Sequence, residues 1–299
     1  MFEGVMSTVL DGKSVSAELS LRLKKRVEDH RASNPSKLPP QLAVVQVGDN
    51  PASKAYINRK IKVAAEIGIL TQHIQHAKNA PHSEIEKTLA KLNNDATVHG
   101  LIVQLPLDQS IKAPETWVNA LLESIRPDKD ADGLNTANLG KIFAGESTSS
   151  QWRAPIPATA LGVMRLLEHY EISPRGKNCV VIGKSRLVGN PTAQLLLQAG
   201  GTVSVVHSQS PDWSYLTQQA DIVVVAAGVK HLLKAEHVSS KCVIVDVGIH
   251  KDATGFFGDA HPDACQKAKA FTPVPGGVGQ MTVACLMENL VELWERFKI

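Results

Sequence analysis

The sequence lacks several features that would each point to a particular class of protein. No apolar run approaches 18 residues, so we expect no membrane-spanning helix and no membrane partner. No run of Lys and Arg exceeds three residues and the formal net charge is only +3, so we expect no nucleic-acid partner. The first residues show no basic segment followed by an apolar one, which predicts a protein without a secretory signal.

Cysteine is also scarce, and its spacing does not suggest a metal site. The chain has 4 cysteines, which form neither C-x-x-C pairs nor groups with histidine at zinc spacing. We therefore expect no metal, and reduced, buried thiols in a cytoplasmic protein. The cysteines are Cys179, Cys242, Cys265 and Cys285.

What the chain does contain is enough apolar sequence for a packed core. Its 299 residues are 43% hydrophobic, sufficient for two medium domains or one large one. In the first half, strands are predicted at 41–48, 71–76 and 100–106, the first and last of them buried, and a helix at 53–68. A further helix is predicted to open at an S-x-x-E capping box that starts at Ser83. Strands that alternate with helices indicate βαβ units and a parallel sheet.

A polar segment with small residues, 144–153, is a candidate domain boundary. After it the alternation restarts, with further buried strands at "NCVVIG", "TVSVVH", "DIVVVAAG" and "CVIVDVG". We therefore predict an α/β fold of two domains around a cleft. The first domain comprises residues 1–147 and is completed by a C-terminal helix at 282–299; the second, residues 150–275, is a Rossmann-like parallel sheet.

The second domain contains a candidate dinucleotide site. Gly183 ends a strand, Ser185 is small, and Gly189 precedes a helix, which gives G-x-S-x-x-x-G in place of the usual G-x-G-x-x-G. A helix that starts after such a turn offers free N–H groups and its positive dipole end to a phosphate. The alternative is an ordinary βα turn that contains glycines.

The end of the next strand favours NADP over NAD. An NAD site usually has Asp or Glu there to bind the ribose 2′-hydroxyl, whereas this strand ends with His207 and Ser208. Lys184, Arg186 and Ser208 are able to donate hydrogen bonds to a 2′-phosphate. Alternatively, one of the two cations is only a solvent-facing residue of the turn.

Tyr56 and Lys60 form a candidate catalytic pair in the first domain. They are four residues apart in the predicted helix, for which Ser53 is a candidate N-cap, so they share a face. Short-chain dehydrogenases have the same Y-x-x-x-K spacing, but there the glycine loop precedes it. Here the pair precedes Gly183 by more than 120 residues, which excludes that interpretation. A chance pair on the surface remains the alternative.

Three more segments carry candidate site residues. Gln104 lies at the C-terminal end of a predicted strand, where parallel sheets bind ligands. Asp130 and Asp132 lie in the loop "RPDKDADGLN", and Asp130 is interpreted as structural. Gly276 and Gly277, in "TPVPGGVGQMT", lack side chains and allow a flat ligand to approach the backbone. Taken singly, a structural amide and ordinary turns would explain these features.

Taken together, six segments resemble a known family. In chain order they are "YINRK", "VHGLIVQLPLD", "PDKDADG", "GKSRLVGNP", "VIVDVGI" and "TPVPGGVGQMT". They are similar to the bifunctional methylenetetrahydrofolate dehydrogenase/cyclohydrolases over residues 10–297. The resemblance implies oxidation of 5,10-methylenetetrahydrofolate by hydride transfer to NADP, then hydrolysis of the methenyl product to 10-formyltetrahydrofolate. It also implies a cytoplasmic homodimer in one-carbon metabolism, which supplies purine biosynthesis.

The resemblance implies a role for each matching residue. Lys60 matches the catalytic lysine, Gln104 its partner, Tyr56 a ring that stacks on the folate, and Asp132 the acid that binds the pterin. An ordinary lysine is a poor base at neutral pH, so we expect burial or a cationic substrate to lower the pKa of Lys60. Folate binding is further implied for Leu105, Pro275, Gly276 and Gly277, and NADP binding for Gly183, Lys184, Ser185, Ser208 and Ile249.

The sequence departs from the family pattern at three places. Gln280 stands where the family usually has Pro, "PATALG" (157–162) where it has P-C-T-P-x-G, and Lys184 where it often has Arg. None of these removes a residue assigned to the chemistry. Two other functions are considered: a dehydrogenase with weak or no cyclohydrolase activity, against which the intact Lys60 and Gln104 argue, and a non-catalytic folate or nucleotide sensor, which would not need Lys60. A formate ligase is disfavoured because the chain has no G-x-x-x-x-G-K-[ST] loop.

Overall fold

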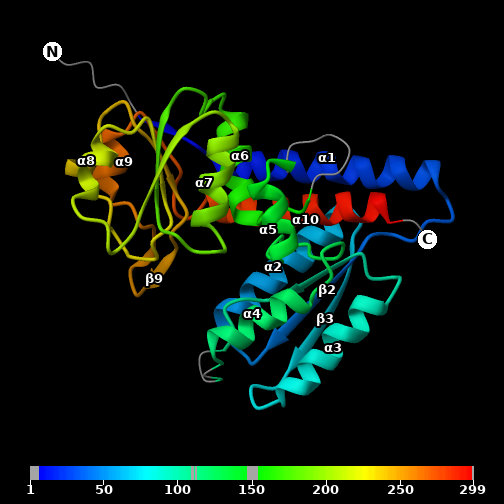
Figure 1. Ribbon diagram of the computed structural model, residues 1–299. Coiled ribbons are helices and arrows are strands. Elements are labelled where there is room, and N and C mark those ends of the chain that lie inside the picture. Colours follow the sequence, from blue (N-terminus) through cyan, green and yellow to red (C-terminus); the bar gives the residue numbers. More distant parts are fainter. Residues whose placement is uncertain (1–6, 109–110, 112, 147–153, 298–299) are drawn as a thin grey trace. The chain divides into compact units, whose positions relative to one another are not determined.

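The computed structural model describes residues 7–108, 111, 113–146 and 154–297. The chain forms two compact units (Figure 1); of the three boundaries between them, 16/17 and 282/283 fall within long helices and 156/157 falls just before a third helix. Unit 1 comprises Met1–Ser16 and Pro157–Thr282, and unit 2 comprises Ala17–Ile156 and Val283–Ile299. Each unit has its own parallel sheet, which confirms the predicted two-domain α/β architecture. Most of the predicted linker, 147–153, lies outside the described residues.

The sheet of unit 2 is built as the sequence pattern predicts. Its strands are β2 (Gln41–Val47), β3 (Leu70–His76) and β4 (Gly100–Val103), in the order β3-β2-β4 with parallel pairing. The crossovers are α2 (Pro51–Ile67) and α3 (His82–Asn94). Strand β2 is buried from its second residue to its last, as expected of a central strand covered on both faces.

The capping box predicted at Ser83 is absent. Helix α3 begins one residue earlier, after Pro81, and Pro81 makes no side-chain capping bond. Glu86, the presumed partner of Ser83, instead accepts a hydrogen bond from Trp117 Nε1 at 3.1 Å. Proline has no side-chain oxygen that could accept an N–H of the first turn, so the helix starts without a side-chain cap.

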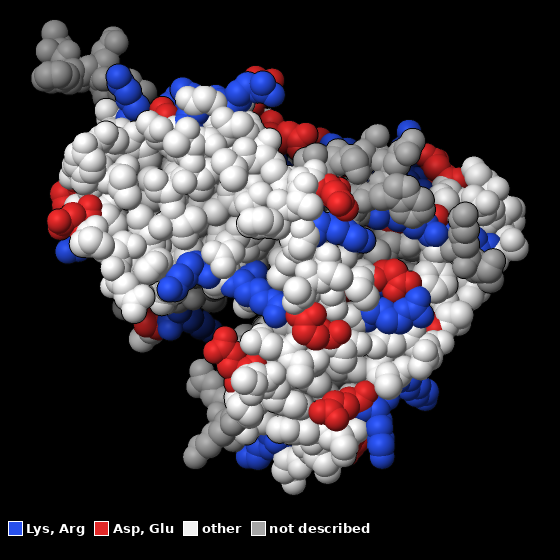
Figure 2. Space-filling model, viewed as in Figure 1, with Lys and Arg blue, Asp and Glu red and all other residues white. Residues whose placement is uncertain are grey.

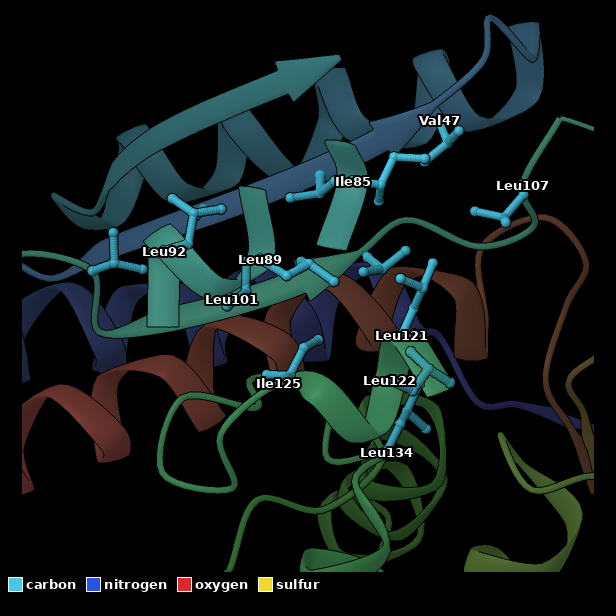
Figure 3. Packing of buried hydrophobic residues seen from close by; sticks show 14 residues of the cluster. Val47, Ile85, Leu89, Leu92, Leu101, Leu107, Leu121, Leu122, Ile125 and Leu134 are labelled. Carbon is cyan, nitrogen blue, oxygen red and sulfur yellow. The ribbon is translucent and has the colours of Figure 1, made fainter. Parts of the chain in front are cut away.

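The apolar core of unit 2 fills the space between its sheet and two of its helices (Figure 3). Leu89 of α3 and Leu101 of β4 are both completely buried within this core. Leu121 and Leu122 come from α4 (Glu115–Ser124) and pack into the same cluster. The remaining helices are α1 (Gly12–Ser33), α5 (Thr136–Phe143) and α10 (Val278–Arg296). Helix α10 begins four residues before the C-terminal helix predicted at 282–299.

Unit 1 contains a sheet in the order β1-β11-β8-β7-β5-β6, again with parallel pairing. Strand β5 has β6 on one side and β7 on the other, so the chain reverses direction across the sheet at β5. Ligands of open parallel sheets bind outside the carboxyl ends of the strands at such a reversal. The strands are β1 (Thr8–Val9), β5 (Asn178–Ile182), β6 (Thr202–Val206), β7 (Ile222–Val225), β8 (Val243–Asp246) and β11 (Ala270–Phe271).

Helices and one hairpin complete unit 1. The hairpin consists of β9 (His250–Asp252) and β10 (Gly255–Phe257), coloured orange in Figure 1. The helices are α6 (Ala158–His169), α7 (Gly189–Gln198), α8 (Trp213–Gln218), α9 (Pro262–Lys267) and the 3₁₀ turn η3 (Ala235–His237).

Two further observations concern the distribution of surface charge and the length and polarity of the helices. Lys and Arg are interspersed with Asp and Glu on the face shown in Figure 2. Every helix in the described part of the chain is too short or too polar to cross a bilayer.

Candidate active site

Helix α2 brings Tyr56 and Lys60 together. The helix begins at Pro51, where Asn50 Oδ1 accepts the backbone N–H of Ser53 at 3.4 Å, so the predicted N-cap at Ser53 is wrong. The two side chains are one turn apart, and Lys60 Nζ lies 5.3 Å from the centre of the Tyr56 ring. An amine at this distance from an aromatic face is within the range of a cation–π contact when it is protonated.

Gln104 holds the amine of Lys60. Lys60 Nζ donates to Gln104 Oε1 at 3.1 Å, and both side chains are almost completely buried. The Gln104 amide nitrogen donates in turn to the carbonyl of Leu105, the next residue, which fixes the orientation of the amide. Ser53 Oγ donates to the carbonyl of Pro106 at 3.1 Å and so ties α2 to the segment that carries Gln104.

The charge environment of Lys60 suits a proton acceptor. Burial lowers the pKa of Lys60, and the carboxylate of Asp132 opposes that change by favouring the charged amine. The direction agrees with the expectation from the sequence, since desolvation disfavours the ammonium form. Asp132 is partly exposed, so a ligand can reach it. Tyr56, Lys60, Gln104 and Asp132 are therefore assembled around one buried amine within unit 2.

Asp130 fixes the loop that carries Asp132. Its carboxylate is buried and accepts the backbone N–H groups of Gly133 at 3.0 Å and Asn135 at 2.8 Å. The side-chain amide of Asn138 donates to the same carboxylate at 2.9 Å. These bonds support the interpretation of Asp130 as structural. Sequence reasoning did not identify the two asparagines, although Asn before a helix, as at Asn135, is a common capping signal.

The glycine turn of unit 1 leaves no room for side chains at two positions. Gly183 has φ +120°, and a Cβ there would overlap the carbonyl oxygen of Ala226. A Cβ on Gly189 would overlap the carbonyl oxygen of Gly183, so the start of α7 packs directly against the turn. This close packing of strand end, turn and helix is the arrangement that a dinucleotide pyrophosphate requires, and the residues present fit that group.

Ser185 caps the helix that follows the turn. Its hydroxyl accepts the backbone N–H of Val188 at 3.2 Å and of Gly189 at 3.3 Å. A hydroxyl that accepts bonds keeps its hydrogen for donation, so Ser185 remains able to bind a phosphate oxygen. Lys184 is exposed beside it.

The segment after β6 is shaped by His207. The ring Nδ1 of His207 accepts the backbone N–H of Gln209 at 3.3 Å, and the backbone N–H of His207 donates to Ser210 Oγ at 3.0 Å. Ser208, between them, is exposed and carries no negative charge. With serine here, no carboxylate stands at this position to repel a phosphate on the ribose.

The segment predicted to line the folate also belongs to unit 1. Gly276 has φ +117°, and a Cβ on Gly277 would lie 2.7 Å from the carbonyl oxygen of Pro273. The preceding residue, Pro275, is exposed, as is Ile249 after β8. The predicted site residues are thus divided: those around Lys60 lie in unit 2, and the glycine segments and Ile249 lie in unit 1.

Comparison with known families gives matches along most of the chain. The model for the catalytic domain of tetrahydrofolate dehydrogenase/cyclohydrolase matches residues 10–132. The model for the NAD(P)-binding domain of the same family matches residues 157–298.

Individual relatives are similar over nearly their whole length. The bifunctional protein FolD of Prochlorococcus marinus is 42% identical, over 97% of this chain and 95% of the relative. The crystal structure of FolD from Campylobacter jejuni is 40% identical with a TM-score of 0.88, over 96% of this chain and 98% of that one. The enzyme of Trypanosoma brucei, solved with NADP and an inhibitor, is 32% identical with a TM-score of 0.88, over 97% and 98%.

Proposed function

Because this chain belongs to the tetrahydrofolate dehydrogenase/cyclohydrolase family, we propose that it carries out both reactions of that family. It oxidises 5,10-methylenetetrahydrofolate to the methenyl compound with NADP and hydrolyses the methenyl compound to 10-formyltetrahydrofolate. The observation that carries the hydrolytic half is the buried amine of Lys60, whose pKa is lowered by burial and which is held by Gln104 at 3.1 Å.

The hydrolysis follows from a neutral amine beside a cationic substrate. Water adds to the methenyl carbon, which is electrophilic because it lies in the N5–C–N10 cation, and the neutral amine of Lys60 accepts the proton that the water loses. As the C–N5 bond breaks, N5 receives a proton from the Lys60 ammonium. The hydroxyl on the former methenyl carbon loses its own proton to the amine so regenerated, which passes it to solvent, and the resulting formyl group stays on N10. Gln104 orients the amine without adding a negative charge that would raise its pKa. The cationic substrate further disfavours the ammonium form of Lys60.

The remaining folate contacts are assigned by their chemistry. The Asp132 carboxylate is able to accept two parallel N–H bonds from the 2-amino-4-oxo edge of the pterin. The Tyr56 ring provides a flat apolar surface for stacking. Leu105, Pro275, Gly276 and Gly277 are assigned to the lining of the folate site.

The oxidation places different demands on the protein. NADP supplies the hydride acceptor, and the protein's task is to hold the two reactants close and aligned. We assign NADP binding to the domain of residues 150–275, through Gly183, Lys184, Ser185, Ser208 and Ile249. Folate binding around Lys60 is assigned to the domain of residues 1–147 and 282–299. The NADP found in the Trypanosoma brucei relative supports this choice of cofactor.

Replacing Lys60 separates the two activities. We expect Lys60→Met to lower the cyclohydrolase rate by about 10²–10⁴-fold, the usual contribution of an acid–base group, and to leave most of the dehydrogenase rate. Formation and decay of the methenyl intermediate are followed by its absorbance, with methylenetetrahydrofolate and NADP as substrates. Circular dichroism establishes that the variant is folded. Equal loss of both activities in a folded variant would contradict the assignment of Lys60.

The same assay with the wild-type protein distinguishes the alternative functions. A dehydrogenase without cyclohydrolase activity would accumulate the methenyl compound, with decay no faster than in buffer. A non-catalytic sensor would give no NADP-dependent change. Replacing NADP by NAD in parallel reactions measures the preference that Ser208 and Lys184 are expected to provide.

We also propose that the protein is a cytoplasmic homodimer in one-carbon metabolism and supplies purine biosynthesis. The family resemblance supports this, and sedimentation of the purified chain at micromolar concentration tests the dimer. A single species with the mass of one chain would contradict it.

A further inference from the structure

A fully buried carboxylate joins two loops at the carboxyl edge of the unit 1 sheet. Asp259 has no exposed side-chain surface, and its Oδ2 accepts the backbone N–H groups of Ala227 at 2.7 Å and Gly228 at 2.8 Å. These residues follow β7. Its other oxygen, Oδ1, contacts Nε2 of His250 at 2.7 Å, and His250 lies in the segment that follows β8. One side chain therefore connects the segments after β7 and β8.

The joined loops are continuous with the glycine turn. Ala226, which precedes the two N–H donors, has its carbonyl oxygen where a Cβ of Gly183 would be. On the other side, a Cβ on Gly248 would overlap Asp259 Oδ1, so the loop after β8 also packs directly on this carboxylate. Any shift of Asp259 would be transmitted to both loops through these contacts, because close-packed groups have no free space to absorb it.

The order of the strands indicates which end of NADP these loops face. The pyrophosphate belongs at the turn after β5, and the adenosine ribose belongs at His207 and Ser208 after β6, on one side of β5. The nicotinamide end must then extend to the other side, over the ends of β7 and β8. Two apolar side chains on the joined loops are largely exposed there: Val229 at 52% and Ile249 at 65%. A flat ring that covers them would bury apolar surface.

We propose that Asp259 and His250 are positioning residues for the nicotinamide end of NADP. Asp259 fixes the peptide at Ala227 and Gly228, and His250, by donating from Nε2, fixes the carboxylate in turn. A buried carboxylate is costly unless its lone pairs are satisfied, and here two backbone donors and one imidazole satisfy them. The proposal rests on the proposed NADP-dependent function, and neither residue is assigned a chemical step.

The test replaces His250, which is partly exposed and therefore tolerates substitution better than the buried carboxylate. We expect His250→Ala to raise the KM for NADP about tenfold, the effect of losing one hydrogen bond to a charged group. The KM for methylenetetrahydrofolate and the hydrolysis of added methenyl compound without NADP should stay unchanged. His250→Gln should restore the KM for NADP, because its amide N–H is able to donate to Asp259.

A matched control is His261→Asn in the same unit. His261 caps α9 through its Nδ1, and Asn preserves such a cap, so this variant should keep the wild-type KM for NADP. Asp259→Asn provides an independent variant. Its amide oxygen still accepts from Ala227 and Gly228, but its amide group loses the charge-assisted bond to His250, so we expect the same rise as in His250→Ala.

Binding of NADPH, followed by its fluorescence, gives a readout that does not depend on turnover. An unchanged dissociation constant in both His250→Ala and Asp259→Asn, or no rescue by His250→Gln, would overturn the proposal. Parallel loss of hydrolysis would also overturn it, since that would indicate general unfolding. Failure of the proposed function is a different result: the wild-type chain would then not oxidise methylenetetrahydrofolate with NADP at all.

Discussion

His99 should make unit 2 sensitive to mild acid. This residue is only 1% exposed, its Nδ1 accepts the backbone N–H of Gln41 at 3.1 Å, and its ring meets Phe297 edge-on. Burial, together with the cations Lys37 and Lys129, lowers the pKa of His99 from 6.5 to about 4. The folded protein therefore holds this ring neutral, whereas the unfolded chain protonates it near pH 6.5.

The sign of the effect follows from this difference. The stability that His99 contributes is present above pH 6.5 and is lost as the pH falls from 6.5 towards 4. At 1.36 kcal/mol for each pH unit, the complete interval corresponds to about 3 kcal/mol, and the step from pH 7 to pH 5 to about 2 kcal/mol. That is a large part of the usual stability of a domain.

Urea unfolding of the wild type and His99→Gln at pH 7, 6 and 5 measures how much His99 contributes to the pH dependence of the free energy of unfolding. Glutamine keeps an oxygen for the N–H of Gln41 and does not titrate. Between pH 7 and pH 5 the free energy of unfolding of His99→Gln should therefore fall by about 2 kcal/mol less than that of the wild type. His169→Gln, at an exposed position in α6, serves as the control and should follow the wild type. Equal acid sensitivity in the wild type and His99→Gln would refute the reasoning.

Two predictions concern the nucleotide site. Gly183→Ala should abolish NADP-dependent oxidation, because its Cβ would overlap Ala226 and φ is +120°, while hydrolysis of added methenyl compound persists in the folded variant. Loss of hydrolysis as well would argue against separate sites. Ser208→Asp should lower the ratio of kcat/KM for NADP to kcat/KM for NAD at least tenfold, because a carboxylate repels the 2′-phosphate. Steady-state rates with each cofactor measure this ratio. An unchanged ratio would show that Ser208 has no part in cofactor selection.

Local sequence patterns were sufficient to predict the elements that carry the candidate site residues of unit 2. The spacing of Tyr56 and Lys60 placed both on one helical face, and the apolar run before Gln104 placed that amide at a strand end. Periodicity identifies such features because they depend only on neighbours in the chain. The bond between Lys60 and Gln104 joins residues 44 positions apart, and only the family resemblance suggested it.

The features that local patterns missed depend on tertiary partners. Strand β1 has two residues, too few to show any alternation, and exists because it pairs with β11. Ser53 has the right residue type for an N-cap, but Asn50 takes that role and frees Ser53 to bond the carbonyl of Pro106. Hydroxyl side chains compete for several backbone partners, so residue type alone does not determine which bond forms.

Burial separates the two kinds of aspartate in this protein better than the motif does. Asp130 and Asp132 share one short loop, yet Asp130 is buried and its oxygens accept hydrogen bonds from backbone and amide donors. Asp132 is partly exposed, so a ligand can reach it. Asp259 resembles Asp130, since it is fully buried and accepts two backbone N–H bonds. A carboxylate in that state is already satisfied, so its contribution to binding must pass through the loop that it holds. On this basis we propose that Asp132 contacts a substrate directly, and that Asp130 and Asp259 influence binding through the loops that they hold.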